Sequence, residues 1–191
     1  MADKFRREHV VEEVFEISQK QDWNLKDILF VPIDEKSIAF RVEHITNDKI
    51  YFVAVNSIRE STVENVNRFL DIYLSKFPDS LKKRMREIEH KKDGKVVRKS
   101  KLTLLSYANV WENTGDHSYD GADDIPFVGL LTDAEKVKNW YGCGCEYFLD
   151  TPDFRNSRYL LYVDYSGNIY SYGGRHSTGG TVPCFALKRK E

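Results

Sequence analysis

The chain has few of the features that mark secreted, membrane or general nucleic-acid-binding proteins. Its three cysteines are an odd number in 191 residues and do not indicate a disulfide framework. The first twenty residues alternate charged and apolar groups, unlike a signal peptide or a membrane span. The 29 Lys and Arg nearly balance the 30 Asp and Glu, so a strong basic excess is missing. We therefore expect a cytoplasmic protein with reduced thiols and no membrane association.

The chain is rich in hydrophobic and aromatic residues. The hydrophobic share of 41% is enough for the core of one domain, and eleven Tyr and eleven Phe are many for this length. We expect one main domain over residues 23–191, preceded by an amphipathic helix over residues 1–22. The apolar stripe of that helix would carry Val10, Val11, Val14 and Phe15. We expect it to dock on the domain, and contact with a partner helix or a second copy is the alternative.

Alternating apolar residues, separated by turn residues, predict antiparallel strands. Pro32 is expected to end the first strand, and Asn47 and Asp48 suit a hairpin turn because both tolerate positive φ. The strands are expected over residues 27–31, 37–46, 49–58, 102–110, 147–149, 159–163, 169–172 and 182–187. Gly173, Gly174, Gly179 and Gly180 are expected to form a loop around Arg175 and His176.

Helices are predicted from capping boxes and from apolar spacing. The capping boxes at 61–64 and 132–135 predict helices that run to Phe77 and to about Tyr141. The first of these helices would bury a stripe of Val63, Val66, Leu70, Tyr73 and Phe77. A short helix from Ser80 would place Leu81, Met85 and Ile88 on one face. Together with the strands, this predicts an α+β fold.

The most basic segment of the chain lies between residues 82 and 101, with Asp93 and Gly94 suited to a hairpin turn in its middle. Its cations are Lys82, Lys83, Arg84, Arg86, Lys91, Lys92, Lys95, Arg98, Lys99 and Lys101. We expect a solvated basic projection, and contact with phosphate or with an acidic protein is the functional alternative. No aromatic residues interleave with the cations, so stacking on single-stranded nucleic acid is not expected.

Two groups of residues contain side chains that commonly bind metals. The loop over residues 112–124 carries Asp116, Asp120, Asp123 and Asp124, but their spacing matches no EF-hand, and a solvated loop is expected. Cys143, Cys145, Cys184 and His176 could bind zinc in principle, yet a Cys-x-Cys pair is a poor match to structural zinc sites. No acid can be paired with His176 to form a catalytic triad. We expect no metal and no cofactor.

The order of these segments resembles a family of uncharacterised bacterial and phage domains with a C-type-lectin-like fold. That family is distantly related to the sulfatase-modifying-factor domains of formylglycine-generating enzymes. The resemblance extends over about residues 24–190, and it is carried by the segments 68–71, 104–107, 127–132, 147–152, 162–167 and 182–187. The chain departs from the family where Tyr147 and Phe148 replace paired tryptophans and where Asp150 replaces an arginine that forms a salt bridge.

The resemblance implies a small, twisted, mostly antiparallel sheet with two or three flanking helices and an added N-terminal helix. It also implies a ligand face made by the segment before the last strand. The residues expected on that face are Asp153, Arg155, Asn156, Arg158, Tyr170, Tyr172, Arg175 and His176. Calcium-dependent sugar binding is not expected, because the segments 151–153 and 162–164 supply too few oxygen ligands. The copper-binding cysteine pair of the oxidase relatives is also missing, since only Cys184 lies in the matching region.

These observations favour a non-catalytic binding protein that recognises a macromolecular partner, most simply a protein, through its C-terminal hairpin face. The phage origin that the resemblance implies makes an accessory or host-defence inhibitor, of the anti-CRISPR type, a concrete form of this hypothesis. One alternative is nucleic-acid binding through the basic segment 82–101. The other is a cysteine- or metal-dependent enzyme that uses Cys143, Cys145 or Cys184.

Overall fold

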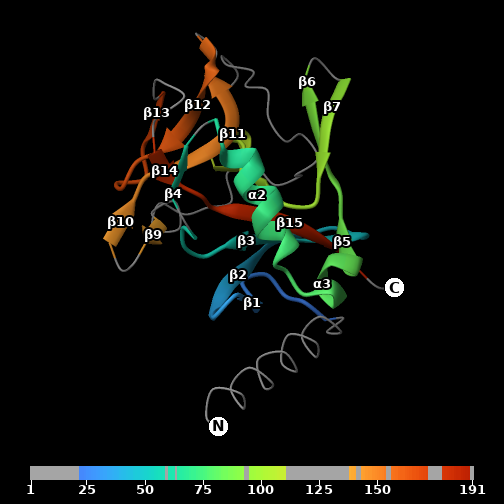
Figure 1. The fold of residues 1–191 in the computed structure, drawn as a ribbon. Coiled ribbons are helices and arrows are strands. Elements are labelled where there is room, and N and C mark those ends of the chain that lie inside the picture. The colour runs from blue at the N-terminus through green and yellow to red at the C-terminus, as the bar shows by residue number, and fades with distance from the viewer. Residues whose placement is uncertain are drawn as a thin grey trace.

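A computed structural model of the chain describes residues 22–58, 60–62, 64–92, 95–110, 138–140, 143–153, 156–171 and 178–189. These residues form an α+β fold of mostly antiparallel sheets, as the sequence predicts (Figure 1). The predicted N-terminal helix and the acidic loop at 112–124 lie outside the described residues. Among the helices that the structure describes, none is long and apolar enough to span a membrane.

The first sheet contains six strands in the order β1-β2-β3-β15-β5, with β8 also paired to β15. Its strands are β1 (Ile28–Ile33), β2 (Lys36–Ile45), β3 (Lys49–Ala54), β5 (Met85–Arg86), β8 (Thr103–Leu104) and β15 (Pro183–Lys188). In β1, buried Leu29 and Val31 alternate with exposed Ile28 and Phe30, as expected for a strand with one covered face. Most of β3 and β15 is buried without alternation, so both faces of the central strands are covered.

The second sheet contains five strands in the order β13-β12-β11-β14-β4. Its strands are β4 (Glu60–Thr62), β11 (Tyr147–Asp153), β12 (Asn156–Val163), β13 (Ile169–Ser171) and β14 (Thr178–Gly180). The turn from β12 to β13 is built on Asp164, whose Oδ1 accepts hydrogen bonds of 2.8 Å from the amides of Ser166 and Asn168. Gly167 has a φ of 85° in this turn, which explains why glycine stands there.

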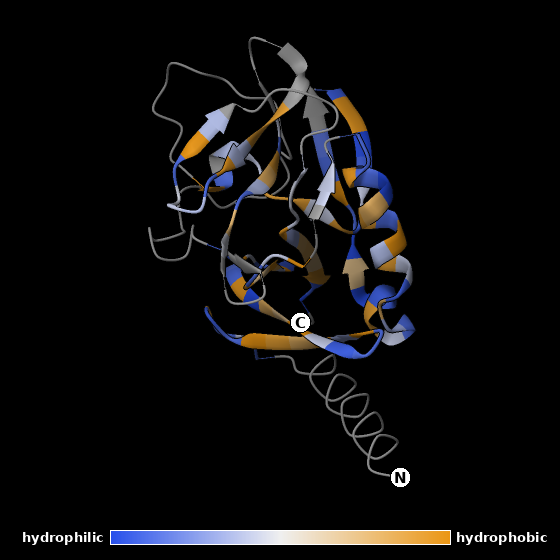
Figure 2. Cartoon of the chain, turned by 60° about the vertical axis from the view of Figure 1, so that its left-hand side comes forward, coloured by the Kyte–Doolittle hydropathy of each residue, from blue (hydrophilic) through white to orange (hydrophobic). Residues whose placement is uncertain are grey.

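Two smaller ribbons and three helices complete the described fold. The ribbons pair β6 (Ile88–Lys92) with β7 (Lys95–Ser100), and β9 (Lys138–Trp140) with β10 (Cys143–Cys145). The helices are α2 (Val66–Ser75), α3 (Asp79–Arg84) and α4 (Tyr107–Val110). As predicted, Val66 and Leu70 of α2 are buried, and Phe77 packs edge-on against Phe40 and Phe185 of the first sheet. In Figure 2, apolar and polar residues accordingly alternate around α2.

Several local predictions are wrong because strand pairing overrides them. Pro32 lies inside β1 and does not end it, which is tolerated because β1 ends the strand order of its sheet. The capping box at 61–64 does not open α2, because Ser61 and Thr62 pair with β14 and Asn65 precedes the helix. Gly179 and Gly180 belong to β14 instead of a loop. The strand predicted over 49–58 ends at Ala54.

Three further predictions name the wrong kind of element. The strand expected over 102–110 is limited to Thr103–Leu104, and α4 follows it. The amide and hydroxyl of Ser106 both donate 2.8 Å hydrogen bonds to Asn109 Oδ1, which favours the turn into that helix. Lys138–Trp140, expected in a helix, forms strand β9. Met85 and Ile88 are buried as expected, but they lie in β5 and β6 after α3 has ended.

Candidate functional site

The basic segment forms a hairpin at its centre, made by β6 and β7. Lys92 pairs with Lys95, so two residues connect the strands, as the predicted turn requires. Figure 1 shows the two strands side by side, leading away from the sheet that contains β15. Lys95, Val96 and Val97 are consecutive exposed residues, and the two valines are 44% and 63% exposed. Neither face of this part of β7 is therefore covered by the described chain.

A β-bulge sets the register at the base of the hairpin. Lys91 pairs with Val96, but His90 pairs with Arg98, so Val97 is the extra residue on β7. A regular ladder from Lys92 and Lys95 would instead have paired His90 with Val97. The bulge places the imidazole of His90 beside the guanidinium of Arg98.

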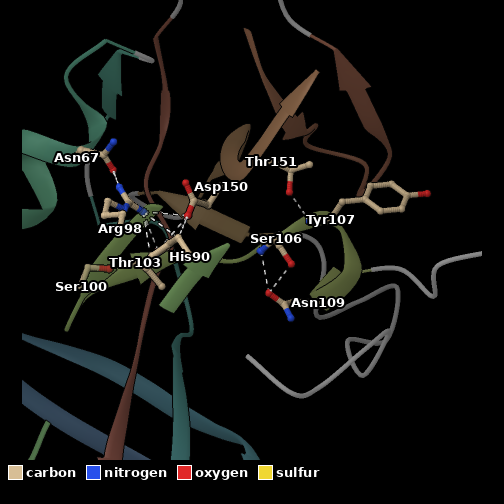
Figure 3. A network of polar contacts seen from close by, with 10 residues as sticks. All are labelled: Asn67, His90, Arg98, Ser100, Thr103, Ser106, Tyr107, Asn109, Asp150 and Thr151. Atoms are coloured by element: carbon tan, nitrogen blue, oxygen red, sulfur yellow. Dashed lines mark hydrogen bonds and ion pairs between the residues drawn. The ribbon is translucent and has the colours of Figure 1, made fainter. Parts of the chain in front are cut away.

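Asp150 of β11 joins this hairpin to the second sheet, as Figure 3 shows. His90 Nδ1 lies 2.5 Å from Asp150 Oδ2, and Arg98 Nη2 donates to the same oxygen at 2.9 Å. The hydroxyl of Thr103 donates to Asp150 Oδ2 at 3.3 Å, and Ser100 Oγ lies 2.9 Å from His90 Nε2. We call the group of His90, Arg98, Ser100, Thr103 and Asp150 the polar anchor.

The polar anchor also reaches helix α2. Arg98 Nη1 donates a hydrogen bond to Oδ1 of Asn67, in the first turn of that helix. The amide of Asp150 donates to the carbonyl oxygen of Leu105 at 2.7 Å, which links β11 to the segment after β8. Arg98 therefore contacts three other elements besides its own hairpin: α2 through Asn67, β11 through Asp150 and β8 through Thr103. Charge-assisted hydrogen bonds of this kind fix the orientation of the groups they join, so the hairpin is held at a defined angle to the domain.

Besides Arg98, three of the described cations of the basic segment form ion pairs or hydrogen bonds within the chain: Lys82, Lys99 and Lys101. Lys82 Nζ lies 2.8 Å from Asp79 and donates to the carbonyl of Ser75, and Lys99 pairs with Glu89 at 2.8 Å. Lys101 Nζ donates to the carbonyl oxygen of Lys82. These contacts leave less positive charge directed at a ligand than the sequence implies.

The remaining cations of the segment differ in exposure. Lys83, Arg86 and Lys95 are exposed. Arg84 is half-buried, and this burial lowers the pKa of its guanidinium. The side chains of Lys91 and Lys92 lie outside the described residues. The basic segment is thus not one solvated projection, because its first part folds into α3 and β5.

The contacts from Ser100 through His90 to Asp150 follow the order of a Ser-His-Asp catalytic triad. Arg98 Nη2, however, lies 3.2 Å from each ring nitrogen of His90, including the one that faces Ser100. Arg98 thus competes with Ser100 for the ring nitrogen that would have to accept the serine proton. We therefore interpret the group as an anchor for the hairpin.

The predicted C-terminal face is described only in part. Asp153, Asn156 and Arg158 lie on the adjacent strands β11 and β12, but their side chains are outside the described residues. Tyr170 of β13 is 51% exposed and stacks on Tyr162 at a ring distance of 5.9 Å. The other members of the predicted face also lie outside the described residues: Arg155, Tyr172, Arg175 and His176.

The cysteines lie in different environments. Cys184 is buried in β15, and this burial, with a smaller effect of Asp150, raises the pKa of its thiol well above the usual range. Cys145 is partly exposed on β10, opposite Lys138. Among the described residues, no group of three or more His, Cys, Asp or Glu side chains is placed to hold a metal. His176, the fourth candidate zinc ligand, is outside those residues.

Sequence reasoning did not find the polar anchor. The one signal was the acidic residue at position 150, where the resemblance led us to expect an arginine. Asp150 forms an ion pair in which its carboxylate is the anion and the guanidinium of Arg98 is the cation. The chain was compared with family models, curated proteins and solved structures, and none of them matches it.

Proposed function

We propose that this chain is a non-catalytic binding protein that recognises a protein partner, with the β6–β7 hairpin as its main contact element. The observation that carries the proposal is a hairpin fixed at its base by the polar anchor and uncovered at Lys95, Val96 and Val97. A preorganised element loses little conformational freedom on binding, so more of its contact energy appears as affinity.

The composition of the hairpin surface favours a protein over nucleic acid. Val96 and Val97 offer apolar area, with Lys95 beside them, which matches the apolar centre and polar rim of protein interfaces. Nucleic-acid binding needs many cations that face the phosphates, yet Lys82, Arg98 and Lys99 are engaged within the chain.

The C-terminal face is proposed as a second contact. Tyr170 supports it, because an exposed, stacked tyrosine is typical of binding hot spots. The C-type-lectin-like assignment and the form of a phage accessory or host-defence inhibitor rest on the resemblance described above. A phage-encoded inhibitor with a C-type-lectin-like fold is the most specific form of this proposal.

The proposal is tested by affinity capture from host and phage lysates with the full chain as bait. The bait variants are wild type, Val96→Ser/Val97→Ser, and Leu25→Ser as a matched control. Leu25 is 58% exposed and precedes β1, outside the hairpin. We expect a protein that wild type and Leu25→Ser retain and that the valine variant loses. Equal retention by all three baits would exclude the hairpin as the contact.

Nucleic-acid binding is distinguished by salt dependence. The exposed cations Lys83, Arg86 and Lys95 are the observation that keeps this alternative open. If they contact phosphates, the affinity for a duplex oligonucleotide falls steeply with salt, and replacing each of them with Gln reduces the slope. A flat salt response would remove nucleic-acid binding from consideration.

A further inference from the structure

A groove runs over the outer side of helix α2, where two adjoining depressions share Phe69 and Ile72. The first has a volume of about 570 Å³ and the second of about 620 Å³. Ile72 is 51% exposed and lines both depressions, so its apolar side chain is accessible to a ligand. The groove is separate from the polar anchor, which contacts α2 through Asn67.

The first depression has the chemistry of a carboxylate site. Among the described residues, its polar lining consists of Ser61, Thr62, Asn65, Arg68 and Thr178, of which Arg68 alone is charged. Asn65 Nδ2 donates to Thr62 Oγ1 at 2.9 Å, so the hydroxyl proton of Thr62 remains available to a ligand. An exposed guanidinium among hydroxyl groups matches the geometry and charge of a carboxylate.

The second depression has an apolar part and a charged rim. Ile33, Ile38, Ile58 and Tyr73 line it, and Tyr73 stacks on Phe69 at a ring distance of 5.4 Å. Its charged rim consists of Asp34, Glu35, Lys36 and Lys76, of which Lys76 and Asp34 pair with each other at 2.5 Å. This end of the groove therefore suits apolar side chains.

We propose that this groove binds a segment of a partner protein in which an acidic side chain stands next to apolar side chains. The acidic side chain pairs with Arg68 in the first depression, and the apolar side chains contact Phe69, Ile72 and the second depression. This inference deepens the proposed function, because it rests on a protein partner, but it uses a surface distinct from the β6–β7 hairpin.

The test uses the full chain and two mixtures of acetylated and amidated heptapeptides. Both mixtures vary Leu, Ile, Val and Phe around a central residue, which is Asp in one mixture and Asn in the other. Retained peptides are quantified by mass spectrometry. We expect about tenfold more of the Asp peptides, as one charge-assisted hydrogen bond supplies. The variant Arg68→Gln should lose this preference, and Ile72→Ser should retain less of both mixtures.

Controls separate this inference from the hairpin. Arg86→Gln removes an exposed cation that does not line the groove, and Val96→Ser/Val97→Ser alters the hairpin, so both should keep the preference for Asp. Equal retention of the two mixtures, or a preference that survives in Arg68→Gln, would overturn the proposal. A third mixture with a free C-terminal carboxylate and central Asn tests the other source of the charge. Its selective retention over the Asp mixture would also overturn the proposal.

Discussion

Asp150 joins three side chains from other elements, and its replacement shows what one carboxylate contributes. In Asp150→Asn the amide loses the charge that His90 and Arg98 both contact. We expect a loss of about 2 kcal/mol in the free energy of unfolding, the usual cost of losing hydrogen bonds to a charged group. Urea unfolding measures it. Asp34→Asn, which removes the charge of a mostly exposed ion pair with Lys76, should leave stability nearly unchanged.

Gly180 stands where the two sheets meet, and a side chain there has no room. Its amide donates to the carbonyl of Glu146 at 2.6 Å, and a Cβ would lie 2.7 Å from that same oxygen and against Ser57 Oγ. We expect Gly180→Ala to cost about 2 kcal/mol in chemical denaturation, because backbone must move. At Gly144 the nearest atom to a Cβ would be 3.4 Å away. An equal loss of stability in Gly144→Ala would show that the close contacts of the new Cβ at position 180 do not cause the destabilisation.

At the scale of elements, the β6–β7 hairpin is held in place by Asp150, a side chain that belongs to neither of its strands. The polar anchor joins β6 and β7 to β8, β11 and α2, so its loss should release the outer part of the hairpin before the domain unfolds. In Arg98→Gln we expect hydrogen exchange of the β6 and β7 amides to accelerate about tenfold or more. The amides of β1 and β2 serve as the internal reference. Uniform acceleration across the protein would instead mean that Arg98 supports the whole fold.

Some helices, strands and turns were predicted correctly from the sequence, and others were not. The turn residues at 93 and 94 predicted the hairpin, but they could not predict the bulge at Val97 that brings His90 to Arg98. Apolar spacing predicted the buried side of α2 through Val66 and Leu70. The pattern at 61–64 favoured a helix start, yet pairing with β14 made Ser61 and Thr62 a strand. Pairing with a distant strand can override a local preference.

At the scale of the whole molecule, strand β15 holds the first sheet together. It pairs with β3 along one edge and with β5 and β8 along the other, and Cys184 is buried within it. Because burial raises the pKa of this thiol, almost no thiolate forms in the folded state at pH 8. We expect Cys184 to react with iodoacetamide only as fast as the protein unfolds globally, as measured by mass spectrometry in increasing urea. Rapid labelling of Cys184 in native buffer would show that β15 opens locally.

The sequence by itself determined the α+β class, the longer strands of the two main sheets and the buried side of α2, because each depends on periodicity or turn chemistry within a short segment. Only the tertiary structure decided which segments meet. Ser57 Oγ accepts a hydrogen bond from the amide of Thr181 and donates one to its carbonyl oxygen, across 124 residues of chain. The polar anchor joins Asp150 to a hairpin more than fifty positions earlier. No local pattern in either segment records such a partner, since the same periodicity fits many pairings. The register that assembles the anchor and the groove is therefore a property of the folded chain as a whole.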